Sequence, residues 1–226
     1  PERANRPFVR DRDGLILAER AGIVVLEGLE TAVARGARIY GEVLGHATSS
    51  DAYHVAAPDP EAKGAIRAMQ WALDDAALTP DDVSYINAHG TSTPVNDVTE
   101  TLAIKRLFGE RAYEVPISST KSAMGHAMGG AGTIESIFTT LALSRGLIPP
   151  TWNYETPDPE CDLDYVPNAP RPADIRVALK NSFGLGGQNA CLVLGRYGNG
   201  RGNGHGNGHE NGQGSGGAGA QGRKAE

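Results

Sequence analysis

The feature that most limits the fold of this 226-residue chain is an alternation of strand-like and helix-like segments over residues 1–197. Apolar, β-branched runs typical of strands occupy residues 15–26, 38–49, 83–88, 115–119, 175–181 and 190–194. Helical patterns occupy residues 27–35, 60–77, 95–108 and 125–145. Strands that alternate with helices predict an α/β fold, layered around a largely buried sheet.

Residues 198–226 have a different composition, with 12 of the 30 glycines of the chain and no large apolar side chain. Such a segment cannot bury enough surface to offset the entropy of ordering it, so we predict a disordered Gly-rich tail. His205 and His209 lie four residues apart in it, but no helix holds them together. A solvated tail is therefore favoured over a metal site.

Composition argues against several classes of protein. No apolar run approaches the roughly 18 residues that a membrane span needs. The formal net charge is −6 and no basic stripe occurs, which argues against a nucleic-acid-binding surface. Two cysteines, Cys161 and Cys191, cannot form a disulfide framework, so thiols in a reducing compartment are favoured. No secretory signal is visible, and a start at Pro1 suggests a processed chain or a piece of a longer one.

Three polar loops rich in small residues each follow a strand-like run. They comprise residues 87–97, 119–132 and 181–189. Loops at the strand ends of an α/β fold are where functional sites are usually built, so we expect the chemistry of this chain in these loops.

Four residues in or beside these loops could carry chemistry: His89, Glu100, Lys121 and His126. His89 is followed by small, turn-forming residues, so its ring can project into a cleft. His126 lies at the predicted start of the helix over residues 125–145, where the positive helix end disfavours imidazolium. A neutral histidine there can donate a hydrogen bond to a developing oxyanion or act as a base. Taken singly, each of the four is better explained by an ordinary structural or surface role.

The residues alone leave other sites open. Two histidines and a carboxylate could bind a metal ion, whereas the chain has no GxxxxGK[ST] loop for a phosphate. Neither cysteine suits a nucleophile. Cys161 stands among carboxylates, which would raise the pKa of its thiol, and Cys191 lies in the apolar run ACLVL.

Taken together, the three loops resemble a known family. They read NAHGTSTPVND, STKSAMGHAMGGAG and NSFGLGGQN, and shorter runs at residues 6–14, 19–22 and 161–167 add to the likeness. These strings resemble the C-terminal half of a β-ketoacyl-acyl-carrier-protein synthase, the elongating type II condensing enzyme of fatty-acid synthesis. The resemblance covers residues 1–197, in the right order and spacing.

The resemblance implies a thiolase-type fold with α-β-α-β-α layers, of which this chain would be the C-terminal half. It implies a decarboxylating Claisen condensation between an acyl thioester and malonyl-carrier protein, with an acyl carrier protein as partner. Family members are usually cytoplasmic homodimers. No metal, nucleotide or flavin cofactor is implied.

Site residues follow from the matching positions. His89 and His126 match the two catalytic histidines of the family, which support decarboxylation and stabilise the enolate oxygen. Lys121 matches the lysine beside them, and Glu100 matches the acidic partner near that lysine. The nucleophilic cysteine of the family belongs to the first half, which this sequence lacks, so we expect the chain to be inactive alone.

The third loop matches the family's oxyanion hole and acyl gate through Phe183 and Leu185. Leu185 replaces the usual phenylalanine; its backbone N–H is retained, but the gating and the acyl-chain preference of the family do not carry over to this position. Gln188 replaces a usual threonine, and Arg20 a usual glycine. Two alternatives stay open: a polyketide-type ketosynthase and a non-catalytic partner subunit of a condensing enzyme.

Overall fold

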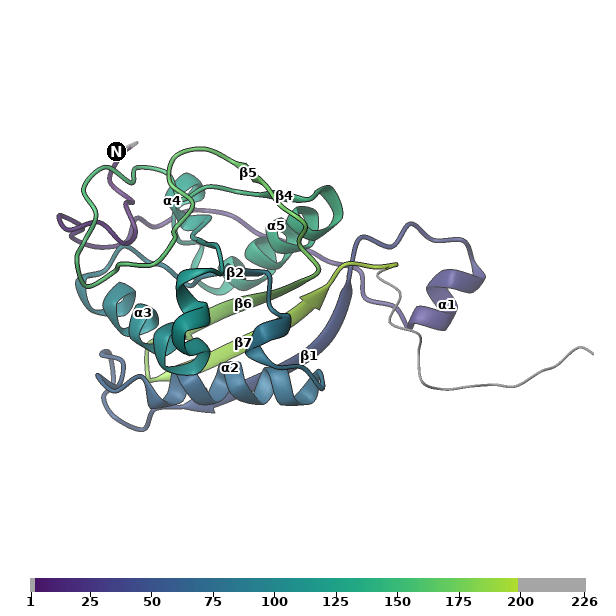
Figure 1. Cartoon of the computed structure of the whole chain (residues 1–226), viewed down its shortest axis with the longest axis horizontal. Helices are drawn as coiled ribbons and strands as arrows, with labels where there is room; N and C mark the ends of the chain where they lie inside the picture. Colours follow the sequence, from purple (N-terminus) through teal and green to yellow (C-terminus); the bar gives the residue numbers. More distant parts are fainter. Residues whose placement is uncertain (1–2, 199–226) are drawn as a thin grey trace, which may run out of the picture.

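The computed structural model describes residues 3–198, with a five-stranded mixed sheet at its centre (Figure 1). The strand order is β1-β7-β6-β2-β3. β6 and β7 form an antiparallel hairpin, β1 pairs antiparallel with β7, and β2 runs parallel to both β6 and β3. The strands are β1 (Glu42–Ser50), β2 (Tyr85–Asn87), β3 (Ile117–Ser118), β6 (Val177–Gly184) and β7 (Gln188–Gly195). The predicted α/β fold is confirmed, and the predicted disorder of the tail concerns residues outside those described, except residue 198.

Helices cover both faces of the sheet, and the strand side chains alternate between them. α2 (Lys63–Asp75) and α3 (Pro94–Phe108) pack on one face, and α5 (Ala131–Arg145) packs on the other. Ile86 and Leu179 join the core under α2 and α3, whereas their neighbours Tyr85 and Ala178 join the core under α5. This period of two gives three layers, α-β-α, as expected for one half of the five-layer fold.

Local chemistry explains where the longer helices begin and end. Thr93 caps α3 by accepting a hydrogen bond from the Asn96 amide at 3.3 Å, and Pro94 occupies the first helical position. Gly146 ends α5 in the left-handed region, with φ of 63°. Gly45 has a packing role, because a Cβ there would stand 2.5 Å from the Ala72 carbonyl oxygen of α2. α2 can therefore lie directly on β1.

The strand-like run at residues 15–26 is not a strand. It is extended, and its only pairing among the described residues is a single bridge from Leu17 to His126. Leu17, Ile23, Val25 and Leu26 are 67 to 90% exposed. The prediction failed because an apolar, β-branched composition favours a strand only where a neighbouring strand is available for pairing. The described part of this chain provides no such strand beside residues 15–26.

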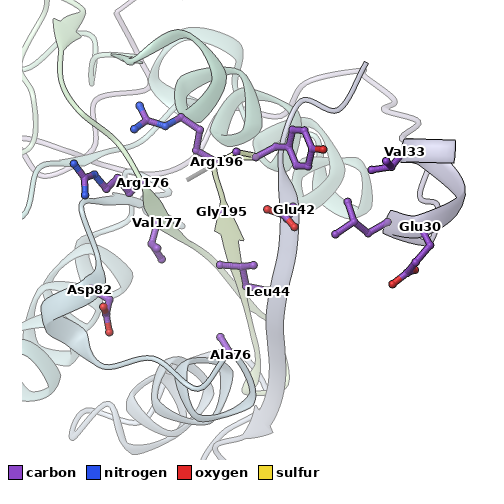
Figure 2. A pocket seen from close by; sticks show the side chains of 13 residues that line it. Glu30, Val33, Glu42, Leu44, Ala76, Asp82, Arg176, Val177, Gly195 and Arg196 are labelled. Carbon is purple, nitrogen blue, oxygen red and sulfur yellow. The ribbon is translucent and has the colours of Figure 1, made fainter. Parts of the chain in front are cut away.

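α1 (Leu29–Ala34), the predicted short helix, stands away from the sheet beside this extended run (Figure 1). A pocket of about 820 Å³ lies between α1 and the ends of β1 and β7 (Figure 2). Val33, Leu44 and Arg176 are among its lining residues. It contains none of the three polar loops, so we do not place the chemistry there.

The helix predicted over residues 125–145 begins later than expected. α4 (Lys121–Met124) and the 3-10 turn η3 (Met128–Gly130) precede α5, which begins at Ala131. Short elements that the sequence did not predict are η1 (Pro80–Asp82), η2 (Gly109–Tyr113), and the paired strands β4 (Leu147–Ile148) and β5 (Arg171–Pro172). Within residues 3–198, no helix has the length and apolar character needed to cross a bilayer.

Candidate active site

The three loops that the sequence singled out line one cleft of about 1030 Å³. The first follows the C-terminal end of β2, the second lies around α4 and η3, and the third is the β6–β7 hairpin. Among the lining residues are His89, Thr91, His126, Phe183 and Leu185. The parallel pairing of β2 with β6 and β3 places the C-terminal ends of these strands at one edge of the sheet, which brings the three loops together.

His89 is held by its own backbone. Its amide and that of Gly90 donate to the two carboxylate oxygens of Glu100, each at 2.8 Å. Gly90 has φ of 40°, and a Cβ there would stand 2.5 Å from the Ser119 Cβ, so only glycine fits. His89 is 6% exposed, and its ring lies edge-on to the His126 ring, with 5.5 Å between centroids. The two histidines therefore face one part of the cleft.

Both histidines use Nδ1 as an acceptor. Nδ1 of His126 accepts from the Met128 amide at 3.0 Å, and Nδ1 of His89 lies 3.3 Å from the Lys121 ammonium nitrogen. Burial lowers the pKa of His89 well below its usual value, and the Lys121 charge lowers it further. The same two causes, burial first, lower the pKa of His126. Each ring is therefore neutral with its proton on Nε2, ready to donate.

His126 is neutral for a different reason from the predicted one. It lies five residues before α5, in the stretch between α4 and η3, so it does not occupy a helix start. Its backbone is fixed instead by residues 16–18: its amide donates to the Ile16 carbonyl at 2.6 Å, and its carbonyl accepts from the Ala18 amide at 3.0 Å. Desolvation and a nearby lysine, rather than a helix end, produce the neutral state.

Lys121 is fully buried and contacts His89 twice. Its Nζ donates to the His89 carbonyl at 2.6 Å, besides facing Nδ1. Its carboxylate partner is Glu135 of α5. Glu100, predicted to be the acidic partner near this lysine, makes no hydrogen bond or ion pair with Lys121 among the described residues, although it lies close enough for its charge to act on Lys121. Its role beside the lysine stays a prediction. Burial lowers the pKa of Lys121, and the Glu135 charge opposes that effect.

Glu100 has a different task. Besides the two amides of the first loop, it accepts from the Asn181 side chain at 3.1 Å. Burial raises the pKa of its carboxyl, against which these hydrogen bonds work. With its oxygens engaged in this way, Glu100 is a brace for the His89 loop rather than a metal ligand. Across residues 3–198, no group of three or more His, Cys, Asp or Glu side chains could hold a metal ion.

Phe183 and Leu185 lie at the hairpin side of the cleft. The Phe183 ring is 5.7 Å from the His89 ring, centroid to centroid, while the Leu185 side chain is 69% exposed. Phe183 therefore packs beside a histidine, and Leu185 stands at the mouth. The roles of both in an oxyanion hole and an acyl gate stay predictions.

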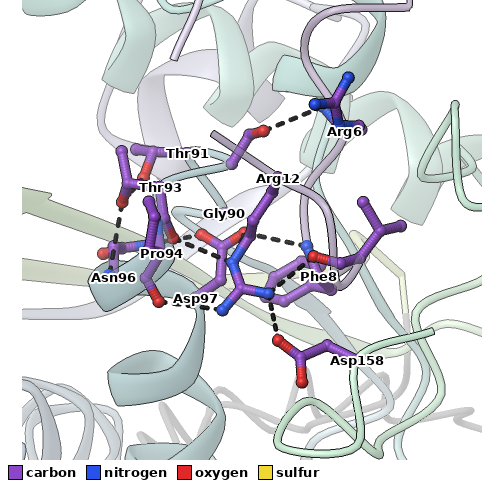
Figure 3. Close-up of polar contacts among 12 residues, drawn as sticks. Arg6, Phe8, Arg12, Gly90, Thr91, Thr93, Pro94, Asn96, Asp97 and Asp158 are labelled. Atoms are coloured by element: carbon purple, nitrogen blue, oxygen red, sulfur yellow. Dashed lines mark hydrogen bonds and ion pairs between the residues drawn. The ribbon is translucent and has the colours of Figure 1, made fainter. Parts of the chain in front are cut away.

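A network from the N-terminal segment clamps the loop after His89 (Figure 3). Arg12 donates to the Thr93 carbonyl at 3.1 Å and to the Pro94 carbonyl at 2.9 Å, and it pairs with Asp158. Asp97 accepts from the Phe8 amide at 2.9 Å. Sequence reasoning missed this clamp, although the segment carrying it was among the resembling runs.

Neither cysteine is among the residues that line the cleft. Both are buried, and burial raises the pKa of each thiol to about 12. A thiol that stays protonated at neutral pH is a poor nucleophile. The expectation that this chain contains no catalytic nucleophile therefore agrees with the environment of both its cysteines.

Comparison with known proteins places this site among related ones. Residues 40–155 match the family described as "Beta-ketoacyl synthase, C-terminal domain". The chain is 56% identical over 197 residues to the 3-oxoacyl-[acyl-carrier-protein] synthase 2 of Synechocystis sp., and 54% identical over 196 residues to that of Staphylococcus aureus. Each match covers 87% of this chain and 47% of the relative, so the chain spans about half the length of these relatives.

Solved structures agree with the family match. One chain in a structure of a type II PKS acyl-carrier protein in complex with its ketosynthase superposes on this chain with a TM-score of 0.85 at 43% identity. The match covers 86% of this chain and 48% of the other. The ishigamide ketosynthase/chain length factor gives a TM-score of 0.83 at 46% identity, covering 86% and 47%. The α-β-α arrangement described above is therefore shared with solved ketosynthases.

Proposed function

Because this chain belongs to the β-ketoacyl synthase family, whose C-terminal domain it contains, we propose that it supplies the decarboxylating half of a condensing active site. The activity is that of a 3-oxoacyl-acyl-carrier-protein synthase of fatty-acid elongation. The observation that carries the proposal is the pair of neutral histidines in one cleft, both with Nδ1 engaged and Nε2 left to donate.

The reaction begins when a malonyl thioester enters the cleft. The bond between its C2 and the carboxylate carbon breaks, CO₂ leaves, and the electron pair moves through C2 into the thioester oxygen. Negative charge therefore develops on that oxygen, and the Nε2–H groups of His89 and His126 donate to it. Preorganised donors of this kind contribute a large share of catalysis because they need no reorganisation as the charge forms.

The remaining step needs a residue from elsewhere. C2 of the enolate attacks an acyl thioester carbonyl, a C–C bond forms, and the C–S bond breaks to release a cysteine thiolate. Neither Cys161 nor Cys191 suits this role, because both thiols are buried with raised pKa values. We propose that a cysteine-bearing half, fused or separate, supplies it. "Completed enzyme" below means this chain together with that half.

Partner and setting follow from the relatives. An acyl carrier protein would deliver both substrates, since one of the superposed ketosynthases is in complex with its own acyl-carrier protein. A homodimer and a cytoplasmic setting are proposed from the family. Higher identity to the 3-oxoacyl-[acyl-carrier-protein] synthases, 54–56% against 43% for the type II PKS structure, favours fatty-acid elongation over the polyketide alternative. The assembled histidines and Lys121 argue against a non-catalytic subunit.

The test is decarboxylation of malonyl-carrier protein by the completed enzyme. His89→Ala and His126→Ala should each lower the rate by about 10²–10³-fold, because one oxyanion donor is lost. Release of labelled CO₂ measures the rate. His46→Ala, which removes an exposed histidine of β1, is the matched control and should retain the rate. Full turnover in either site variant would rule out the assigned roles.

A further inference from the structure

Lys180 is a buried cation that the proposed reaction does not use. It lies on β6, immediately before the third loop, with its side chain 2% exposed. It is absent from the residues that line the cleft. Its Nζ donates to the Ser182 hydroxyl and lies 2.9 Å from Oε2 of Glu135. A lysine is rarely buried unless a partner or a function requires it there.

Glu135 links Lys180 to the histidines. Oε1 of Glu135 contacts Lys121, and Oε2 faces Lys180, so one carboxylate lies between two ammonium groups. Oε2 accepts no hydrogen bond of good direction, so its contact with Lys180 is an ion pair rather than a directed bond. Lys121 in turn holds the carbonyl and Nδ1 of His89. Lys180 therefore acts on His89 through two intermediates.

Four elements packed around the histidines each contribute a buried charge, and the segment after β1 adds Asp51 and His54 to the cleft lining. α3 contributes Glu100, α4 contributes Lys121, α5 contributes Glu135 and β6 contributes Lys180. Within this buried set of four, two cations and two carboxylates balance when both histidines are neutral. A proton on either ring adds an uncompensated buried charge, which a low-dielectric interior disfavours. Loss of Lys180 would leave a net negative site that attracts that proton.

We propose that Lys180 is a positioning residue: through Glu135 it holds Lys121 against His89, and its charge keeps both histidines unprotonated and able to donate from Nε2. This inference deepens the proposed function and rests on it for the catalytic consequence. The electrostatic part does not depend on catalysis, because Lys180 lowers the pKa of His89 and of His126 in the folded protein, as a weaker contribution than burial or Lys121.

The experiment removes the charge of Lys180 in the completed enzyme. Lys180→Met and Lys180→Gln should each raise the pKa of the two histidines, so the acid limb of decarboxylation against pH should move upward by about one pH unit. Lys180→Gln retains a hydrogen-bonding side chain, so it separates charge from space filling if Lys180→Met fails to fold. Lys180→Arg retains the charge and should leave the limb in place.

Two further measurements make the result decisive. Arg176→Met removes the same charge from an exposed position just before β6 and should not move the limb. NMR titration of isotope-labelled histidine rings reports protonation without turnover. An unmoved limb and unmoved ring titrations in both neutral variants would overturn the proposal. Absence of decarboxylation in the unsubstituted enzyme would instead overturn the proposed function, while the ring titrations still test Lys180.

Discussion

The site and the segment over residues 15–28, here called the arm, distribute charge and apolar surface in opposite ways. In the site, Lys121, Glu135 and Lys180 are almost completely buried and paired with one another. In the arm, Ile23 and Val25 are 90 and 83% exposed. Buried charges are costly unless paired, and contiguous exposed apolar side chains mark a surface that needs a partner. The buried charges of the site therefore have partners within the chain, whereas apolar side chains of the arm such as Ile23 and Val25 stay exposed in the described part of it.

Breaking the buried charge cluster should give the largest effect on stability. Glu135→Leu leaves two lysines buried without their shared carboxylate, and we expect the free energy of unfolding of the completed enzyme to fall by about 3–5 kcal/mol. Urea denaturation measures it. Glu27→Gln in the arm, which removes an exposed pair with Arg35, should cause no measurable change. Equal effects of the two substitutions would abolish the contrast between the regions.

Removing apolar surface from the arm should have opposite effects in two settings. Val25→Ser should reduce self-association of the 226-residue chain, because it removes exposed apolar area. In the completed enzyme, we propose that the other half covers the arm. There, Val25→Ser should lower the free energy of unfolding by about 1.5–3 kcal/mol. Light scattering measures the first effect and denaturation the second. If the completed enzyme loses no stability, the arm is not covered.

Lowering the pH should reduce the stability of the folded enzyme through His89, by less than the substitutions above. The folded pKa of His89 is lowered, so between that value and its ordinary one the unfolded chain binds more protons. Stability from the neutral ring is present above the ordinary value and is lost as pH falls, by at most about 1.4 kcal/mol per pH unit. Burial raises the pKa of Glu100, which acts with the opposite sign.

Substituting His89 separates its contribution to the pH dependence of stability from that of Glu100. Between pH 7 and pH 5, His89→Asn should lose less stability than the unsubstituted enzyme, as measured by denaturation at each pH. His46→Asn removes a largely exposed histidine and serves as the control. An identical pH dependence in His89→Asn and the unsubstituted enzyme would contradict the buried neutral ring.

Much of the fold could be predicted because it depends on local patterns. The spacing of Ala65, Met69, Ala72 and Leu73 marks one face of α2, and these residues are buried as expected. The start of α5 was misplaced because residues 125–130 contain no proline to mark a boundary, yet residues 124 and 126 hydrogen-bond to residues 16–20 and the chain forms the short turn η3 before α5 begins. Those contacts come from a distant part of the sequence, which no local pattern reveals.

The candidate site was predicted in its loops but not in its charge pairing. His89, Lys121 and His126 stand in polar loops whose composition singled them out. Glu135 lies on α5 and Lys180 in a buried strand, and nothing in their neighbouring residues marks them as partners. A lysine directly after the apolar residues 177–179 of a strand-like run was the available signal for Lys180.

The sequence by itself determined which residue types stand at the strand ends, which segments alternate as strand and helix, and that no cysteine here lies in a reactive setting. These properties are local, because propensity, capping and periodicity act over a few residues. Only the tertiary structure decided that Glu135 rather than Glu100 pairs with Lys121, and that burial rather than a helix end keeps His126 neutral. Charge pairing and desolvation depend on distances between segments far apart in the chain, which folding alone fixes.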